Sequence, residues 1–211
     1  MQYSPKKIIE YLRLKDIAHL FLLLFVLPWA LIAKIFIRDF WLICEDANEA
    51  RDNGYWLFKW IRTNHPEQKV AYAINKKSDD HANVKGLGKI VGFGTLSHWF
   101  WYIVADKNIS SQKNGKPNAA VCYLFEVVFK MRKNNRVFLQ HGITKDDAEW
   151  LYYTNCMFRL FVCGAKPEYE YIKERFGYPE RNIVYTGFCR FDGMHDGRQK
   201  GNGNRILVMP T

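Results

Sequence analysis

The segment RVFLQHG, residues 136–142, carries the pattern that decides the fold of this chain. A short run of apolar, β-forming residues leads directly into His141 and Gly142. RLFVCG (159–164) and NIVYTG (182–187) repeat the form, each a strand that ends in glycine. Strands of this buried kind, alternating with helices, are typical of a parallel sheet covered on both faces. We therefore predict an α/β fold built on a Rossmann-like parallel sheet.

The same alternation extends toward the N-terminus and toward the end of the chain. Further strands are predicted at WLICED (41–46), VAYAI (70–74), KIVGFG (89–94), NISSQ (108–112) and RILVMPT (205–211). Helices are predicted over residues 48–64, after Thr95, over 119–133 with a basic end, and over 166–176. Strand 205–211 follows the polar loop 196–204 and is expected to open a second domain. Three segments result, with boundaries 1–39, 40–200 and 201–211.

Residues 1–39 are predicted to associate with a membrane. The apolar run LFLLLFVLPWALIA, residues 20–33, lies between Lys6, Lys7, Arg13 and Lys15 on one side and Lys34 and Arg38 on the other. It is shorter than the roughly 20 residues of a spanning helix, and Pro28 is expected to kink it. We predict a helix that lies in the cytoplasmic leaflet with its basic residues on lipid phosphates. A buried core helix and a single membrane span remain as alternatives.

Charge and cysteine content narrow the classes of function. The formal net charge of +10 suits nucleic acid, an anionic membrane surface or phosphate-bearing substrates. The apolar N-terminus and the lack of a basic–aromatic RNA-binding pattern argue against nucleic acid. Phosphate-loop, dinucleotide-binding, zinc-protease and nucleophile-elbow motifs are absent from the sequence. The five cysteines show no CxxC pair, which predicts reduced, buried thiols and no metal site.

His141 is the candidate catalytic residue. It follows a strand directly, and ligands of parallel sheets bind beyond the carboxyl ends of the strands. An imidazole titrates near neutral pH and can take a proton from an attacking hydroxyl, whereas the alternative is a histidine that only caps a turn. Gly142 would allow a ligand to approach the backbone.

Other polar residues near strand ends are candidates for substrate contacts. Lys145 and Arg190 would meet phosphate oxygens, and Asp146 would orient the imidazole or start a helix. Alternatively, Lys145 and Asp146 belong to a solvated loop, and Arg190 forms a surface ion pair with an aspartate such as Asp192. The remaining candidates, for which capping and turn chemistry is the alternative, are Asn53, Gly54 and Ser110.

In order and spacing, several of these stretches resemble the CDP-glycerol glycerophosphotransferase family, which makes teichoic acids and related capsular polymers. The matching stretches are ARDNGYWLFKWIRTNHP (50–66), VAYAINKKSDD (70–80), NISSQ, VFLQHGITKD (137–146), the Cys163-Gly164 strand end, TGFCRFD (186–192) and ILVMPT (206–211). The DNGY and QHG stretches, combined with RFD and MPT, are the specific part of this resemblance, which covers nearly all of residues 40–211.

The resemblance implies the N-terminal domain of a GT-B-type transferase, with Arg190 and Asp192 inside its RFD motif. His141 matches the family's His-Gly histidine, proposed as the base that deprotonates the acceptor hydroxyl. That hydroxyl would attack the glycerol-bearing phosphorus of CDP-glycerol, and CMP would leave. The implied partners are CDP-glycerol, a lipid-linked polyol phosphate or glycan acceptor, and the cytoplasmic face of the cell membrane. No cofactor is implied, and the need for a metal stays open.

One departure from the family pattern affects the expected activity. The family continues after MPT with a tryptophan-arginine pair and a second domain that binds the donor, whereas this sequence ends at Thr211. The chain is therefore expected to represent the acceptor-side half of such an enzyme. The alternative is an inactive half that only binds membrane or acceptor.

Overall fold

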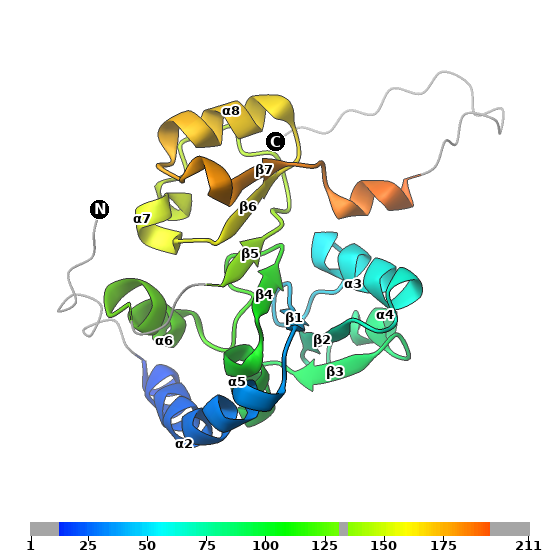
Figure 1. Ribbon diagram of the computed structural model, residues 1–211, viewed down its shortest axis with the longest axis vertical. Helices are drawn as coiled ribbons and strands as arrows, with labels where there is room; N and C mark the ends of the chain where they lie inside the picture. Colours follow the sequence, from blue (N-terminus) through cyan, green and yellow to red (C-terminus); the bar gives the residue numbers. More distant parts are fainter. Residues whose placement is uncertain (1–12, 131–134, 195–211) are drawn as a thin grey trace.

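A seven-stranded parallel sheet forms the centre of the computed structural model, which describes residues 13–130 and 135–194 (Figure 1). The strands lie in the order β3-β2-β1-β4-β5-β6-β7, and every neighbouring pair is parallel. The α/β, Rossmann-like prediction is confirmed. The strands are β1 (Phe40–Ile43), β2 (Lys69–Ile74), β3 (Lys89–Gly92), β4 (Lys107–Ser110), β5 (Arg136–Phe138), β6 (Leu160–Cys163) and β7 (Ile183–Tyr185).

Burial of the strands follows their place in the sheet. β2, between two neighbours, buries every residue from Val70 to Ile74, whereas the edge strands β3 and β7 are only partly buried. A strand covered by helices on both faces has no polar side, so its sequence is a continuous apolar run rather than an alternating one. All seven strands lie where the sequence predicted them, and the apolar run of β2 is the clearest example. The predicted linker 196–204, the strand 205–211 and the basic helix end 131–133 lie outside the described residues.

Helices cover both faces of the sheet (Figure 1). α3 packs with β1 and β2 over one apolar cluster, and α5 packs over a second cluster with α2 outside it. A third cluster lies beneath α7 and α8. The helices are α2 (Leu14–Phe36), α3 (Asn53–Asn64), α4 (His81–Val84), α5 (Leu96–Val104), α6 (Ala119–Tyr123), η1 (Leu124–Val128), η2 (Glu149–Leu151), α7 (Tyr153–Cys156), α8 (Lys166–Arg175), η3 (Glu180–Asn182) and η4 (Cys189–Gly193).

Two predicted helices differ from the structure. The helix predicted over 48–64 begins only at Asn53, because the Asp52 side chain accepts the Asn53 N–H and residues 48–52 form a loop. The helix predicted over 119–133 is α-helical only to Tyr123 and continues as the π-helix η1. η1 contains the buried carboxylate of Glu126, which accepts a hydrogen bond from the Tyr102 hydroxyl at 2.9 Å.

The N-terminal apolar segment is the single helix α2, which is longer than the predicted run 20–33. It continues through Pro28 as one helix, and the kink expected at that residue stays a prediction. One narrow face, which includes Leu23, Val26 and Ala30, packs toward α5 and α6. By length and composition α2 is apolar enough to cross a membrane, a test that core helices of soluble proteins and signal sequences also pass. Of its most apolar window, 17% is buried inside the protein.

Gly115 lies where the loop after β4 passes over the end of β1. A Cβ built there would meet the Ser110 hydroxyl oxygen and would lie 2.7 Å from the backbone oxygens of Cys44 and Glu45. We expect Gly115→Ala to lower the free energy of unfolding by about 2–3 kcal/mol, because backbone atoms cannot give way. Urea unfolding measures the loss. The control is Gly142→Ala, whose Cβ would have nothing within 4 Å; equal stability of the two variants would contradict the prediction.

Candidate functional site

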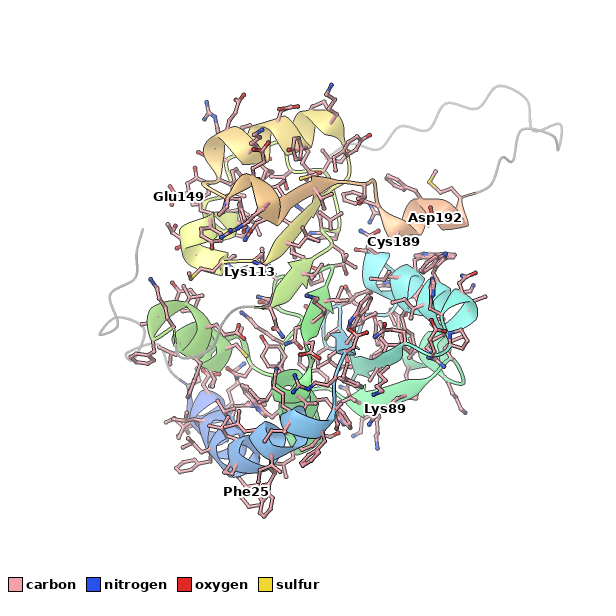
Figure 2. All side chains as sticks on the ribbon, in the orientation of Figure 1. Phe25, Lys89, Lys113, Glu149, Cys189 and Asp192 are labelled. Carbon is pink, nitrogen blue, oxygen red and sulfur yellow. The ribbon has the colours of Figure 1, made fainter. Side chains whose placement is uncertain are left out.

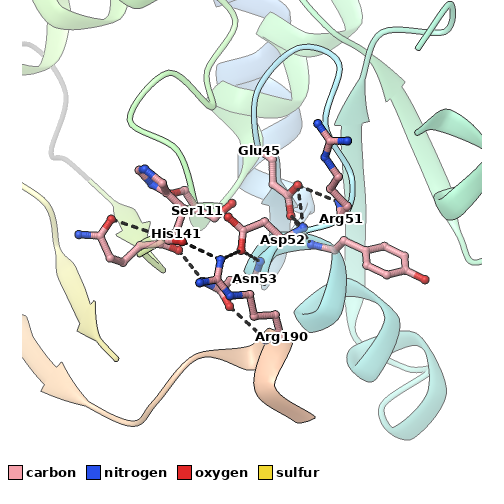
Figure 3. Close-up of polar contacts among 9 residues, drawn as sticks. Glu45, Arg51, Asp52, Asn53, Ser111, His141 and Arg190 are labelled. Carbon is pink, nitrogen blue, oxygen red and sulfur yellow. Dashed lines mark hydrogen bonds and ion pairs between the residues drawn. The ribbon is translucent and has the colours of Figure 1, made fainter. Parts of the chain in front are cut away.

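Loops from several strands meet at the carboxyl edge of the sheet and form the candidate site (Figure 3). The order β3-β2-β1-β4-β5 means that successive strands are added first on one side of β1 and then, from β4, on the other. In parallel sheets, ligands bind in the crevice beyond the strand ends at such a switch point. The loop after β1 supplies Glu45 and Asp52, the loop after β4 supplies Ser111, and the loop after β5 supplies His141. The turn η4 adds Arg190 from the far end of the described chain.

His141 presents an exposed imidazole at this edge. Its Nδ1 lies 3.2 Å from the backbone oxygen of Ser111. A carbonyl oxygen only accepts hydrogen bonds, so Nδ1 carries the proton and the neutral ring keeps its lone pair on Nε2. The ring is therefore oriented by the backbone and is able to accept a proton at Nε2.

The backbone beside His141 is held in an unusual conformation. Gln140 has a φ of 61°, a left-handed value that is uncommon for a residue with a side chain. Its own amide stabilises the turn, because Oε1 accepts the His141 N–H at 3.0 Å and Nε2 donates to the Thr144 hydroxyl at 2.7 Å. The buried carboxylate of Glu168 then accepts the Thr144 N–H at 2.8 Å and the Gly164 N–H at 2.7 Å.

Asn53 connects three segments that are far apart in the sequence. Its side chain is fully buried, donates from Nδ2 to the Gln140 backbone oxygen at 2.6 Å and accepts the Arg190 backbone N–H at 3.0 Å. Asn53 thus holds the N-terminus of α3, the His141 loop and η4 together. The structure brings Asn53, His141 and Arg190 into one hydrogen-bond network and places Asn53 behind the His141 loop as a support.

Arg190 fixes the same loop from the outside. Its Nη1 donates to the Asp52 carboxylate at 2.8 Å and to the His141 backbone oxygen at 2.6 Å. Arg190 therefore forms the Arg–Asp pair that was the alternative to a phosphate contact, and its partner is Asp52. The Arg190 side chain is still 35% accessible, so it could also contact a phosphate. That predicted contact stays a prediction.

Glu45 is buried beneath the loop after β1. Its carboxylate accepts backbone N–H groups of Arg51 and Asp52, each at 3.0 Å, and of Tyr55 at 2.7 Å. Burial raises the pKa of the Glu45 carboxyl above its ordinary value, although these three donors oppose the shift. Gly54 packs directly on this side chain, since a Cβ at Gly54 would lie 3.0 Å from the Glu45 Cγ.

The other predicted site residues lie at the same edge in different surroundings. The Ser110 hydroxyl is buried and turned toward the Gln112 backbone oxygen, which matches the turn alternative. Lys145 and Asp146 are exposed on the His141 loop, Gly142 has open space beside it, and Asp192 is exposed on η4 (Figure 2). No helix begins at Asp146, so only its predicted roles beside the imidazole or a ligand remain as predictions.

We expect Asn53→Ala to lower the free energy of unfolding by about 2 kcal/mol, because it leaves the Gln140 oxygen and the Arg190 N–H without their partner. Hydrogen exchange should also speed up in residues 139–144, which Asn53 holds in place. The matched control is Asn48→Ala, at an exposed position in the same loop region. Unchanged exchange in 139–144 would show that Asn53 does not support the His141 loop.

The cysteines and acidic residues of the described ranges, 13–130 and 135–194, provide no metal site. No group of three His, Cys, Asp or Glu side chains in these ranges is arranged to hold a metal ion. The cysteines are free thiols, four of them buried. Burial raises the pKa of Cys122 to about 11 and that of Cys163 to about 12, so both stay protonated near neutral pH.

The known proteins that are similar to this chain in sequence or in fold take part in teichoic acid synthesis. No protein-family model matches the chain. The chain is 32% identical over 180 residues to the minor teichoic acid biosynthesis protein GgaB of Bacillus subtilis (strain 168), in an alignment that covers 82% of this chain. The alignment covers 19% of GgaB, so the chain spans about a fifth of the length of this curated relative.

The fold is also similar to that of solved structures. Two structures of variants of the wall teichoic acid polymerase TagF, one soaked with CDPG for 30 minutes, each give a TM-score of 0.53. They are 12% and 9% identical to this chain, cover 95% and 88% of it, and are themselves covered to 51% and 49%. At these identities the likeness shows a shared fold alone. The sequence relationship to GgaB confirms the resemblance to proteins of teichoic acid synthesis that the sequence predicted.

Proposed function

We propose, from the premise that this chain is of the CDP-glycerol glycerophosphotransferase type, that it forms the acceptor side of a transferase. The enzyme would move glycerol phosphate, or a similar polyol phosphate, from CDP-glycerol to a lipid-linked or polymer acceptor in teichoic acid or capsular polysaccharide synthesis. One observation carries this proposal: an exposed imidazole at the carboxyl edge of the sheet, with Nδ1 held by the Ser111 carbonyl.

The proposed reaction uses His141 as a general base. Nε2 accepts the proton of the acceptor's terminal hydroxyl, and the oxygen attacks the glycerol-bearing phosphorus of CDP-glycerol. A new P–O bond forms, the phosphoanhydride P–O bond breaks, and CMP leaves with the bonding electrons. The Ser111 carbonyl stabilises the imidazolium that results, because Nδ1–H continues to donate to it.

The proposed location is the cytoplasmic face of the cell membrane, with α2 lying in the interface. Large apolar side chains project from the face of α2 that is not packed on the protein, among them Phe21 and Phe25, each 67% exposed, and Trp29, 63% exposed. Figure 2 shows Phe25 at the outer edge of the molecule. Arg13 and Lys15 at one end of α2 and Arg38 just beyond the other add positive charge for anionic lipid phosphates.

The decisive experiment measures CMP release from CDP-glycerol in the membrane fraction of cells that express the natural gene, with and without a lipid-linked acceptor. We expect release that depends on the acceptor. Equal CMP release with and without the acceptor would indicate hydrolysis of CDP-glycerol rather than transfer. No release, combined with retained binding of acceptor or membrane, would favour the alternative of a binding module without activity.

A further inference from the structure

A cavity of about 280 Å³ lies between α2, α5 and the α6–η1 segment, apart from the candidate site. One wall is a row of leucines four positions apart on α2, which therefore lie along a single face of the helix. The opposite wall consists of large apolar side chains from α5 and η1. The residues that define the cavity are Leu23, Leu27, Leu31, Trp99, Ile103 and Phe125.

The few polar groups of the cavity wall are engaged within the protein. The Tyr102 hydroxyl donates to the Glu126 carboxylate at 2.9 Å. Lys34 Nζ donates to the backbone oxygens of Ile103 and Ala105 at 3.2 and 3.3 Å, at the end of α5. A cavity lined in this way is a poor site for water, which needs two to four polar partners, and a good site for an apolar ligand.

The cavity adjoins the exposed apolar face of α2. Leu31 lines the cavity and is itself 52% exposed, and Leu24 and Ile35 on the neighbouring stripe are 51% and 62% exposed. A hydrocarbon chain that reaches this face can therefore enter between α2 and the body of the protein. His141 lies in the loop after β5, whereas the cavity is lined by α2, α5 and the α6–η1 segment, so the two are formed by different elements.

We propose that this cavity binds one acyl chain of a membrane phospholipid. A volume of about 280 Å³ is large enough for part of one acyl chain and too small for a whole lipid. Leu23, Leu27 and Leu31 form a continuous apolar wall along one helix face, which suits an unbranched hydrocarbon chain. The inference rests on the proposed membrane association of α2 and adds a specific lipid site to it.

The test is native mass spectrometry of the purified chain in detergent after incubation with dioleoyl phosphatidylglycerol. We expect a one-to-one lipid adduct, and a fraction bound at least tenfold lower in Leu27→Phe, which fills the cavity. The matched control is Leu24→Phe, on the exposed face of the same helix, which should bind as the unaltered chain does. If Leu27→Phe fails to fold, as shown by circular dichroism, Cys122→Leu adds bulk at a second position of the wall.

Sedimentation with phosphatidylglycerol vesicles separates this inference from the proposed function. Vesicle binding without an adduct in detergent would overturn the cavity inference and leave membrane association standing. An adduct without vesicle binding would support the cavity and contradict the membrane role of α2. Equal adducts in Leu27→Phe and the unaltered chain, or adducts formed only with a polyisoprenyl phosphate, would overturn the assignment to a phospholipid chain.

Discussion

The His141→Ala variant is expected to lower acceptor-dependent CMP release by about 10²- to 10⁴-fold, the usual contribution of a positioned general base. The loss should appear in kcat, because the imidazole acts on the proton that moves during the reaction. The ring is exposed and makes one side-chain hydrogen bond, to the Ser111 oxygen, so we expect stability to change by only about 0.5 kcal/mol. Loss of activity without loss of stability is the result that identifies a base.

The matched control for this variant is His65→Ala. His65 is also exposed, and its Nδ1 contacts Glu67 at 3.3 Å just beyond the end of α3. The rate of CMP release is measured for both variants in membranes, and thermal unfolding is measured on the purified proteins. Normal turnover of His141→Ala would remove the base assignment while leaving the family and the fold intact.

The sheet was predictable from the sequence because each strand carries its own signal. Residues 70–74 and 160–163 are short, continuous apolar runs, which are typical of a strand that is covered on both faces. Helix ends were less predictable. α3 begins at Asn53 because the loop before it is tied to Glu45, and η1 departs from the α-helix around the buried Glu126, and neither effect is visible in local periodicity.

The sequence predicted those parts of the site whose position follows from the order and direction of the strands. His141 directly follows a parallel strand, so its place at the carboxyl edge follows from the sheet. The pairing of Arg190 with Asp52 across 138 positions of the sequence does not follow from any local pattern. The supporting role of Glu168 was missed because a buried polar residue looks like a surface residue in the sequence. Asn53 was singled out, but its hydrogen bonds to Gln140 and Arg190 were not predicted.

Among these supporting residues, Glu45 has a buried carboxylate whose removal from water costs free energy. A carboxylate excluded from water is costly unless hydrogen bonds replace its hydration. Three backbone N–H groups do so here, and they also close the loop that places Asp52 beside Arg190. Since burial still raises the pKa of Glu45, the ionised carboxylate is less stable in the folded protein than in water, despite these donors.

Glu45→Ala is therefore expected to lower the free energy of unfolding by about 3 kcal/mol or more, because hydrogen bonds to a charged group are worth roughly 1.5–3 kcal/mol each. That is a large part of the roughly 5–15 kcal/mol of a typical domain. Urea unfolding measures the loss. Asp46→Ala, at a half-buried position next along the chain, is the control. Equal losses would show that the Glu45 contacts are not specifically stabilising.

Glu45→Gln tests the charge separately. The folded-state pKa of Glu45 lies above its unfolded value, so the folded protein binds this proton more tightly than the unfolded chain does. Stability from this group is full below the ordinary pKa of 4.5 and declines as pH rises through the folded pKa. The stability advantage of the unaltered chain over Glu45→Gln should therefore shrink as the pH rises above 4.5. An advantage that grows over this range would mean that the three N–H donors outweigh burial and lower the pKa instead.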